Sequence, residues 1–193
     1  DKRYLNDEMF VNADVRDLPQ PMTETDKEIL KDTSLDYRVL NLASNTFNEN
    51  ETSYYHKSIG GYHPAKLRRY QELIEEYIHP EMQATMSAIV EAQGDMTLVS
   101  DSVSPVLNML NTKYFIVPLQ ENRTMPLQNL NAFGNAWFVS DVKYVQNANE
   151  ELEAMRGVDL RTTAIADRKF ADALGKTEQQ DSASVVTITE YAP

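Results

Sequence analysis

The stretch Lys113-Tyr-Phe-Ile-Val117 carries the strongest strand signal in the chain, and it decides the fold class. Its β-branched and aromatic side chains favour a pleated, half-buried backbone. Pro118 should end the strand, because proline cannot donate a hydrogen bond to a sheet ladder. Residues 37–43 form a second predicted strand, since successive side chains there alternate between two faces.

Helical patterns lie between and beside these strands. Apolar side chains recur at helical spacing over residues 64–79, with Pro64 at the first helical position. Pro80 should end this helix or start another, because its ring disfavours a continuing helical backbone. Similar apolar stripes or capping residues predict further helices at residues 27–31, 82–93, 105–110, 148–156 and 167–174.

The remaining segments complete the predicted architecture. Residues 120–132 are expected to be loop, and further strands are expected at 96–100, 136–145 (bent, or a hairpin), 161–166 and 185–191. Alternating strands and helices predict an α/β (mixed α+β) fold, with a mixed sheet of about five strands covered by helices. Residues 1–36 form an extended, short-helical leading segment, and residues 37–193 a single domain. The last strand has nothing after it to pair with, so we expect it to belong to a β-rich portion of a longer protein.

The composition excludes several classes of protein. The chain has 193 residues, 30 acidic and 18 basic side chains, a formal net charge of -12, three histidines and no cysteine. The acidic balance argues against binding to nucleic acid or anionic lipid, because both need Lys and Arg. The missing cysteine excludes thiol catalysis, cysteine zinc sites and disulfides. No apolar run approaches the roughly 18 residues of a membrane span.

The sequence lacks familiar catalytic and cofactor motifs. There is no HExxH zinc motif, no GxSxG nucleophile motif and no glycine-rich phosphate loop. The glutamates of residues 72–76 are typical of a solvated helix face. We therefore predict no catalytic residue, no metal and no cofactor.

One segment, residues 53–70, stands out from the acidic background. It combines four tyrosines, two histidines and four basic side chains around Gly60-Gly61. Aromatic rings beside cations suit a sugar, a sugar phosphate or an anionic headgroup. The alternative is that the rings pack a loop onto the following helix while the cations offset neighbouring acids.

This segment resembles the YfhO-type family of bacterial multi-pass membrane proteins. The similar blocks are Tyr37-Arg-Val-Leu-Asn41, residues 48–70, Leu107-Asn-Met-Leu-Asn-Thr-Lys-Tyr-Phe-Ile116, Asn131-Ala-Phe-Gly-Asn-Ala-Trp-Phe-Val139 and Asn147-Ala-Asn-Glu-Glu151. Their order and approximate spacing hold over residues 37–191. The first 36 residues add only Arg3-Tyr-Leu-Asn6 to the similarity.

The resemblance carries its own implications for function. Proteins of this family are similar in layout to integral-membrane glycosyltransferases of the cell envelope that use lipid-phosphate sugars. In that class the catalytic acid lies in a loop between early transmembrane helices, outside the present residues. The resemblance thus implies an extracytoplasmic (periplasmic) domain of a cytoplasmic-membrane protein, without a catalytic centre of its own.

Two hypotheses for function follow from the resemblance. In the first, the domain positions an acceptor glycan or a polyprenyl-phosphate sugar, or covers the membrane-embedded site. In the second, it is a structural or interaction domain that docks onto its parent protein's membrane region or a partner, and an exposed apolar patch is expected. The residues expected to face the ligand or the docking partner are Tyr54, Tyr55, His56, Lys57, Tyr62, His63, Lys66 and Arg69, with Trp137 as a weaker candidate. A free-standing enzyme, the third alternative, would need a deep pocket with convergent titratable groups.

Overall fold

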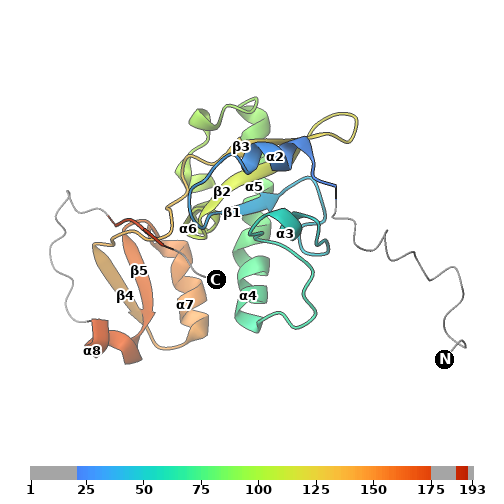
Figure 1. Ribbon diagram of the computed structural model, residues 1–193. Helices are drawn as coiled ribbons and strands as arrows, with labels where there is room; N and C mark the ends of the chain where they lie inside the picture. The colour runs from blue at the N-terminus through green and yellow to red at the C-terminus, as the bar shows by residue number, and fades with distance from the viewer. Residues whose placement is uncertain (1–20, 175–185, 191–193) are drawn as a thin grey trace, which may run out of the picture.

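The computed structural model describes residues 21–174 and 186–190 and confirms a mixed α/β fold (Figure 1). Its main sheet contains β1 (Arg38–Asn41), β2 (Thr112–Pro118) and β3 (Thr124–Gln128) in the order β1-β2-β3. β1 is parallel to β2, whereas β3 is antiparallel to it. The segment predicted most strongly from the sequence is therefore the central strand.

Both faces of this sheet are covered. Val39 and Leu40, which are adjacent in β1 and point to opposite faces, are both 0% exposed. Val39 packs with Ile29 and Ile116 in a small cluster, while Leu40 and Phe115 belong to the main core. Buried positions on both faces identify a sheet that lies between layers of helix rather than against solvent.

Helix α2 (Glu24–Ile29) covers the smaller of these two clusters. Thr23 caps it through a capping box in which the Thr23 side chain and the Asp26 carboxylate each accept a backbone N–H. Ile29 at its end is fully buried, and the Thr25 hydroxyl donates to the Thr124 carbonyl of β3 at 2.9 Å. Residues 21–36 thus pack onto the sheet, and the rest of the leading segment lies outside the described residues.

The longest helical stretch runs through α4 (Arg68–Leu73), the π-helical segment η2 (Ile74–Ile78) and α5 (His79–Glu91) without interruption. Pro80 does not end the helical stretch. Of its two predicted roles, the structure has the second, the start of a further helix, with Pro80 in the first turn of α5. A proline ring collides with the carbonyl four residues before it, and the wider π turn, in which the His79 N–H reaches the Ile74 carbonyl, lies just there.

The start of this helix also differs from the prediction. It begins at Arg68 rather than at Pro64, which lies in a turn. The His63 Nδ1 accepts the Ala65 N–H at 3.2 Å, and such a local side-chain bond competes with helix formation. The short helix α3 (Thr52–Tyr55) lies earlier in the same tyrosine-rich region.

Several short turns follow α5. The strand predicted at residues 96–100 is instead the 3₁₀ turn η3 (Met96–Leu98), where the Asp95 carboxylate accepts the Thr97 N–H at 3.0 Å. A second turn, η4 (Asp101–Val103), leads to α6 (Pro105–Met109). The loop predicted at residues 120–132 contains β3, whose sequence lacks β-branched residues apart from Thr124.

A separate unit of two strands corrects the prediction of a single five-stranded sheet. β4 (Asp141–Val145) and β5 (Thr163–Asp167) pair with each other in parallel, joined by α7 (Ala148–Ala154) and η5 (Met155–Gly157). They lie to one side of the main sheet, followed by η6 (Arg168–Phe170) and α8 (Ala171–Leu174) (Figure 1).

Two predicted strand segments are not strands. Residues 136–139 form no strand before β4, so the predicted bent strand is shorter. Residues 186–190 are also irregular, because no strand of the described portion pairs with them, while Val185 and Tyr191 of that prediction lie outside it.

Asparagine side chains hold the connection between the two units in place. The Asn129 Nδ2 donates to the Asn108 Oδ1 and to the Thr112 carbonyl, both at 2.8 Å, and the Asn131 Nδ2 donates to the Val99 carbonyl at 3.0 Å. Asn108 and Asn129 are buried. These residues fix the loop that carries Trp137 against the core.

Candidate functional site

The eight predicted site residues do not gather in one place. Tyr55 lines a cavity of about 380 Å³ beside the carboxyl end of β1, whereas Arg69 lines a separate groove between α4 and α7. His56 is buried, and Tyr54, Tyr62 and His63 are exposed. The segment 53–70 is therefore continuous in sequence but divided among several environments.

His56 is a packing residue in this fold. Its side chain is 1% exposed, and its Nε2 lies 2.9 Å from the Asp26 Oδ1. Burial alone would raise the pKa of Asp26, but hydrogen bonds from Thr23 and from His56 outweigh burial and hold the pKa below its usual value. The pair ties α3 to the first turn of α2; the His56 side chain is enclosed, whereas Asp26 lines the cavity beside β1.

Replacing Asp26 with alanine should lower the free energy of unfolding by about 2 kcal/mol, because the capping box is lost and buried His56 loses its partner. In the native chain this contribution is present above a pH of about 4 and is lost as the pH falls through the lowered pKa. Urea unfolding at pH 7 and pH 3 measures both effects. Glu24→Ala, in the same turn but exposed, is the control; equal stability of the two variants would contradict the assignment.

The basic members of the predicted site already have partners. Lys57 contacts the Asp36 carboxylate at 2.5 Å, and Arg69 contacts the Glu151 carboxylate at 2.5 Å. The Lys66 ammonium lies 5.2 Å from the centre of the Phe47 ring. These contacts match the alternative in which the cations offset neighbouring acids and rings.

The tyrosines remain accessible. Tyr54 is 58% exposed and meets Tyr55 edge to face, with ring centres 4.9 Å apart. Tyr62 is 65% exposed. These two exposed rings, on neighbouring segments, are within reach of a ligand.

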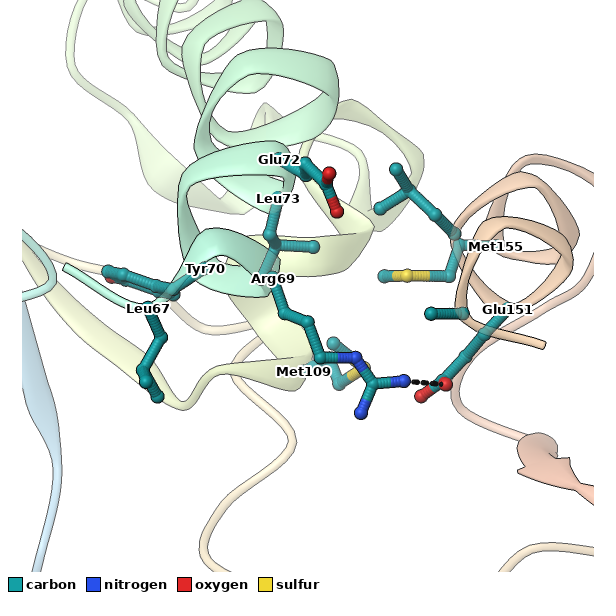
Figure 2. Close-up of a pocket in the computed structure, with 10 residues that line it drawn as sticks. Leu67, Arg69, Tyr70, Glu72, Leu73, Met109, Glu151 and Met155 are labelled. Atoms are coloured by element: carbon teal, nitrogen blue, oxygen red, sulfur yellow. Dashed lines mark hydrogen bonds and ion pairs between the residues drawn. The ribbon is translucent and has the colours of Figure 1, made fainter.

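An apolar groove of about 350 Å³ lies between α4 and α7. Figure 2 shows Tyr70 and Leu67 on one side, Met155 on the other and Met109 at the floor. Arg69 reaches across toward Glu151, so an ion pair spans the groove at its rim. We call this space the α4–α7 groove; its lining is Leu67, Arg69, Tyr70, Glu72, Leu73, Met109, Ala148, Glu151, Leu152 and Met155.

A second cavity extends this groove toward β5. It has a volume of about 260 Å³ and shares Met109, Glu151 and Met155 with the groove, so the two are neighbours. Trp137 lines its far end and packs edge to face on Phe133 at 5.0 Å. Within the described residues, the Trp137 indole N–H has no hydrogen-bond partner.

The opposite end of the groove is acidic. A hollow of about 320 Å³ adjoins it through Glu72 and Leu152, and its lining includes Glu75, Glu76 and Glu153. Arg156 also lines this hollow and pairs with Glu76. The site thus changes along its length from apolar, at Trp137, to negatively charged, at Glu153.

The lining of this groove favours apolar contacts. Its lining is dominated by Leu, Met and aromatic side chains, and methionine adapts its shape to a bound surface. In the described residues, no group of three or more His, Asp or Glu side chains is placed to hold a metal ion. None of the described helices combines the length and apolar character needed to cross a bilayer.

Sequence reasoning found only part of this groove. The sequence points to Arg69 and to Trp137 of the neighbouring cavity, whereas Leu67 and Met109 belong to apolar helical stripes and Met155 lies in a predicted helix. Residues 69, 109, 137 and 155 are far apart in sequence, and only packing of α4 against the β4–α7–β5 unit brings them together.

Comparison of the chain with protein-family models, with curated proteins and with solved structures gives no match. The resemblance to the YfhO-type family therefore rests on the sequence blocks alone.

Proposed function

We propose that this chain is a non-catalytic docking domain whose working surface is the α4–α7 groove. In this proposal it lies at the extracytoplasmic face of the bacterial cytoplasmic membrane, as part of a multi-pass protein similar to envelope glycosyltransferases. It docks there onto its parent protein's membrane region or a partner polypeptide. The support is the exposed apolar surface that such a domain requires, together with the resemblance in sequence.

The position of Leu67 carries the proposal. Leu67 is 77% exposed, lines the groove and occupies the N-cap of α4, where its side chain makes no capping hydrogen bond. Leucine does not stabilise a helix at the N-cap. A Ser or Asp side chain there would accept a hydrogen bond from one of the unpaired backbone N–H groups of the first turn. An exposed leucine at a position where a polar residue would stabilise the fold indicates a role in binding.

Replacing Leu67 with serine should raise the free energy of unfolding by about 0.5–1 kcal/mol while it weakens docking. The gain arises because serine caps α4, and little burial is lost at a side chain that is mostly exposed. Thermal and urea unfolding measure the stability. A loss of more than about 1 kcal/mol would show that Leu67 supports the fold and would remove the argument for binding.

Docking itself is tested in the intact parent protein. A photo-crosslinking amino acid placed at Leu67 should form a specific crosslink to the parent's membrane region or to a partner subunit. Leu98 is a matched control, because it is 71% exposed but does not line the groove. Crosslinks of equal yield at the two positions, or none at Leu67, would contradict the proposal.

A second function is favoured by the exposed rings of Tyr54 and Tyr62. Such rings can stack on sugar faces, which supports positioning of an acceptor glycan or a polyprenyl-phosphate sugar. Titration with glycan fragments, followed by NMR, should shift the signals of these tyrosines. Tyr54→Ala and Tyr62→Ala are the informative variants, whereas His56→Ala would disturb the buried pair with Asp26. Undiminished glycan binding in both tyrosine variants would exclude this site.

A further inference from the structure

We propose that the occupant of the α4–α7 groove is a basic amphipathic helical segment of another polypeptide region. This inference rests on the docking function proposed above and adds the chemistry of the partner. Apolar side chains of the segment would enter the groove, and its Lys or Arg side chains would face the acidic end.

The apolar part of the argument comes from the shape of the site. The groove and the neighbouring cavity at Trp137 share three lining residues, and together they present Leu, Met, Tyr and Trp side chains; we call the two together the trough. One wall is the helix α4 and the other is α7 with η5. A trough between two helices accepts a third helix, whose apolar residues at i, i+3, i+4 and i+7 form a single row.

The charged part comes from the rim. Glu76 is paired with Arg156, Glu72 with Arg68 and Glu151 with Arg69. Glu75 and Glu153 line the acidic hollow, are exposed, and have no Lys or Arg of the described portion within 4.0 Å. The hollow therefore carries an excess of negative charge beside an apolar trough, which a partner of opposite charge would complement.

The apolar groove and the acidic hollow lie next to each other. Glu72 and Leu152 line both the apolar groove and the acidic hollow, so one segment can occupy both at once. Its basic side chains would follow its apolar anchors along the same direction, from Trp137 toward Glu153. An acidic or uncharged segment would bury the same apolar surface but would meet repulsion, or no attraction, at this end.

The test uses the chain of residues 1–193 and three peptides of about 14 residues that lack aromatic side chains. The first is an amphipathic Leu/Lys helix, the second a Leu/Glu helix of the same pattern, and the third a Lys/Ser peptide with the charge but no apolar face. Trp137 is the chain's single tryptophan and lines the trough, so its fluorescence reports occupancy. We expect the Leu/Lys peptide to bind at least about tenfold more tightly than either of the others.

Charge-reversal variants locate the effect. Glu75→Lys with Glu153→Lys should remove the preference for the Leu/Lys peptide. Glu91→Lys with Asp172→Lys changes the net charge equally at exposed sites that do not line the groove, and it should keep the preference. Loss of the preference in both double variants would overturn the inference, because attraction to a chain of charge -12 would then suffice.

Leu67→Ser separates this inference from the docking function. Suppose that Leu67→Ser weakens binding of the Leu/Lys and Leu/Glu peptides equally and that the native chain binds both with the same affinity. The groove then docks apolar segments, and the inference that the partner is basic is contradicted. If Leu67→Ser leaves Leu/Lys binding unchanged, the peptide binds elsewhere and the inference fails. The docking function is judged independently, by the crosslink at Leu67 in the parent protein.

Discussion

Replacing Gly60 with alanine should lower the free energy of unfolding by about 3 kcal/mol. A Cβ at this position would overlap the carbonyl oxygen of Thr46 and lie 2.6 Å from its Cγ2. The obstacle is backbone, which cannot rotate away as a long side chain can. The Gly61 N–H donates to this same carbonyl at 2.7 Å. Moving the segment at Thr46 or the segment at Gly60 would therefore also break this hydrogen bond.

The effect should extend to the tyrosine-rich loop. Residues 57–61 run beside β1, where the Val39 N–H donates to the Lys57 carbonyl at 2.9 Å and the Ile59 N–H donates to the Val39 carbonyl at 3.0 Å. Displacing Gly60 would lengthen these two hydrogen bonds and expose the side chain of Ile59, which is 2% exposed in the native fold. Urea unfolding and amide hydrogen exchange of Val39 and Ile59 measure the change.

Gly157 supplies the control. A Cβ built there meets no atom within 4 Å, and the backbone does not need a positive φ. Gly157→Ala should change the free energy of unfolding by less than about 1 kcal/mol, with either sign. Similar losses in the two variants would show that close approach to Thr46 is not the cause.

Replacing Glu81 with alanine should lower the free energy of unfolding by about 2–3 kcal/mol. Glu81 lies on α5, is 8% exposed, and its two carboxylate oxygens accept the Val106 N–H at 2.9 Å and the Leu107 N–H at 2.8 Å. These are orphan donors of the first turn of α6, and alanine would leave both buried without an acceptor. Glu91→Ala, exposed on the same helix, is the control and should have little effect.

The same carboxyl group gives the chain a distinctive pH dependence. Burial raises the pKa of Glu81 to about 7, although the two backbone N–H donors oppose the shift. The native state therefore holds a proton over a range in which the unfolded chain has lost it. Stability should fall as the pH rises from about 4.5 to about 7, by at most about 3 kcal/mol, and stay level above that range.

Glu81→Gln isolates this contribution because glutamine does not titrate. Urea unfolding at half-unit steps between pH 4.5 and pH 8 should show a decline in the native chain that is smaller in the variant. This pH dependence of the free energy of unfolding is opposite to that expected from Asp26. The lowered pKa of Asp26 makes the free energy of unfolding decrease as the pH falls. Parallel pH profiles of the native chain and Glu81→Gln would contradict the assignment.

Local sequence patterns predicted the elements whose signals lie within a few residues. The strand at 113–117, the helix capped by Asn147 and the helix opened by Ser104-Pro105 are present in the structure. Local pattern left two roles open for Pro80, and the structure has the second: Pro80 lies in the first turn of α5, directly after the π turn. β3 was missed because pairing with β2, rather than its own composition, makes it a strand.

For the predicted site, too, the sequence identifies the segment and tertiary packing decides where its side chains lie. The sequence singled out residues 53–70 correctly as unusual, but tertiary packing assigns its members to different tasks. His56 is paired inside the fold, Arg69 crosses the groove rim, and Tyr54 and Tyr62 face solvent. A cluster in sequence becomes a site only if the backbone turns its side chains toward one point, and the turn at Gly60-Gly61 separates them instead.

From the sequence alone follow a mixed α/β chain, its acidic balance, its lack of cysteine and a strong strand at 113–117. These properties follow from composition and from side-chain alternation over a few residues. The central place of that strand comes from the structure. Only the tertiary structure decided that the strands divide into two sheets and that α4 packs near α7. It thereby created the groove between α4 and α7, since contacts such as that of Arg69 with Glu151, 82 positions apart, depend on packing free energy that no local pattern encodes.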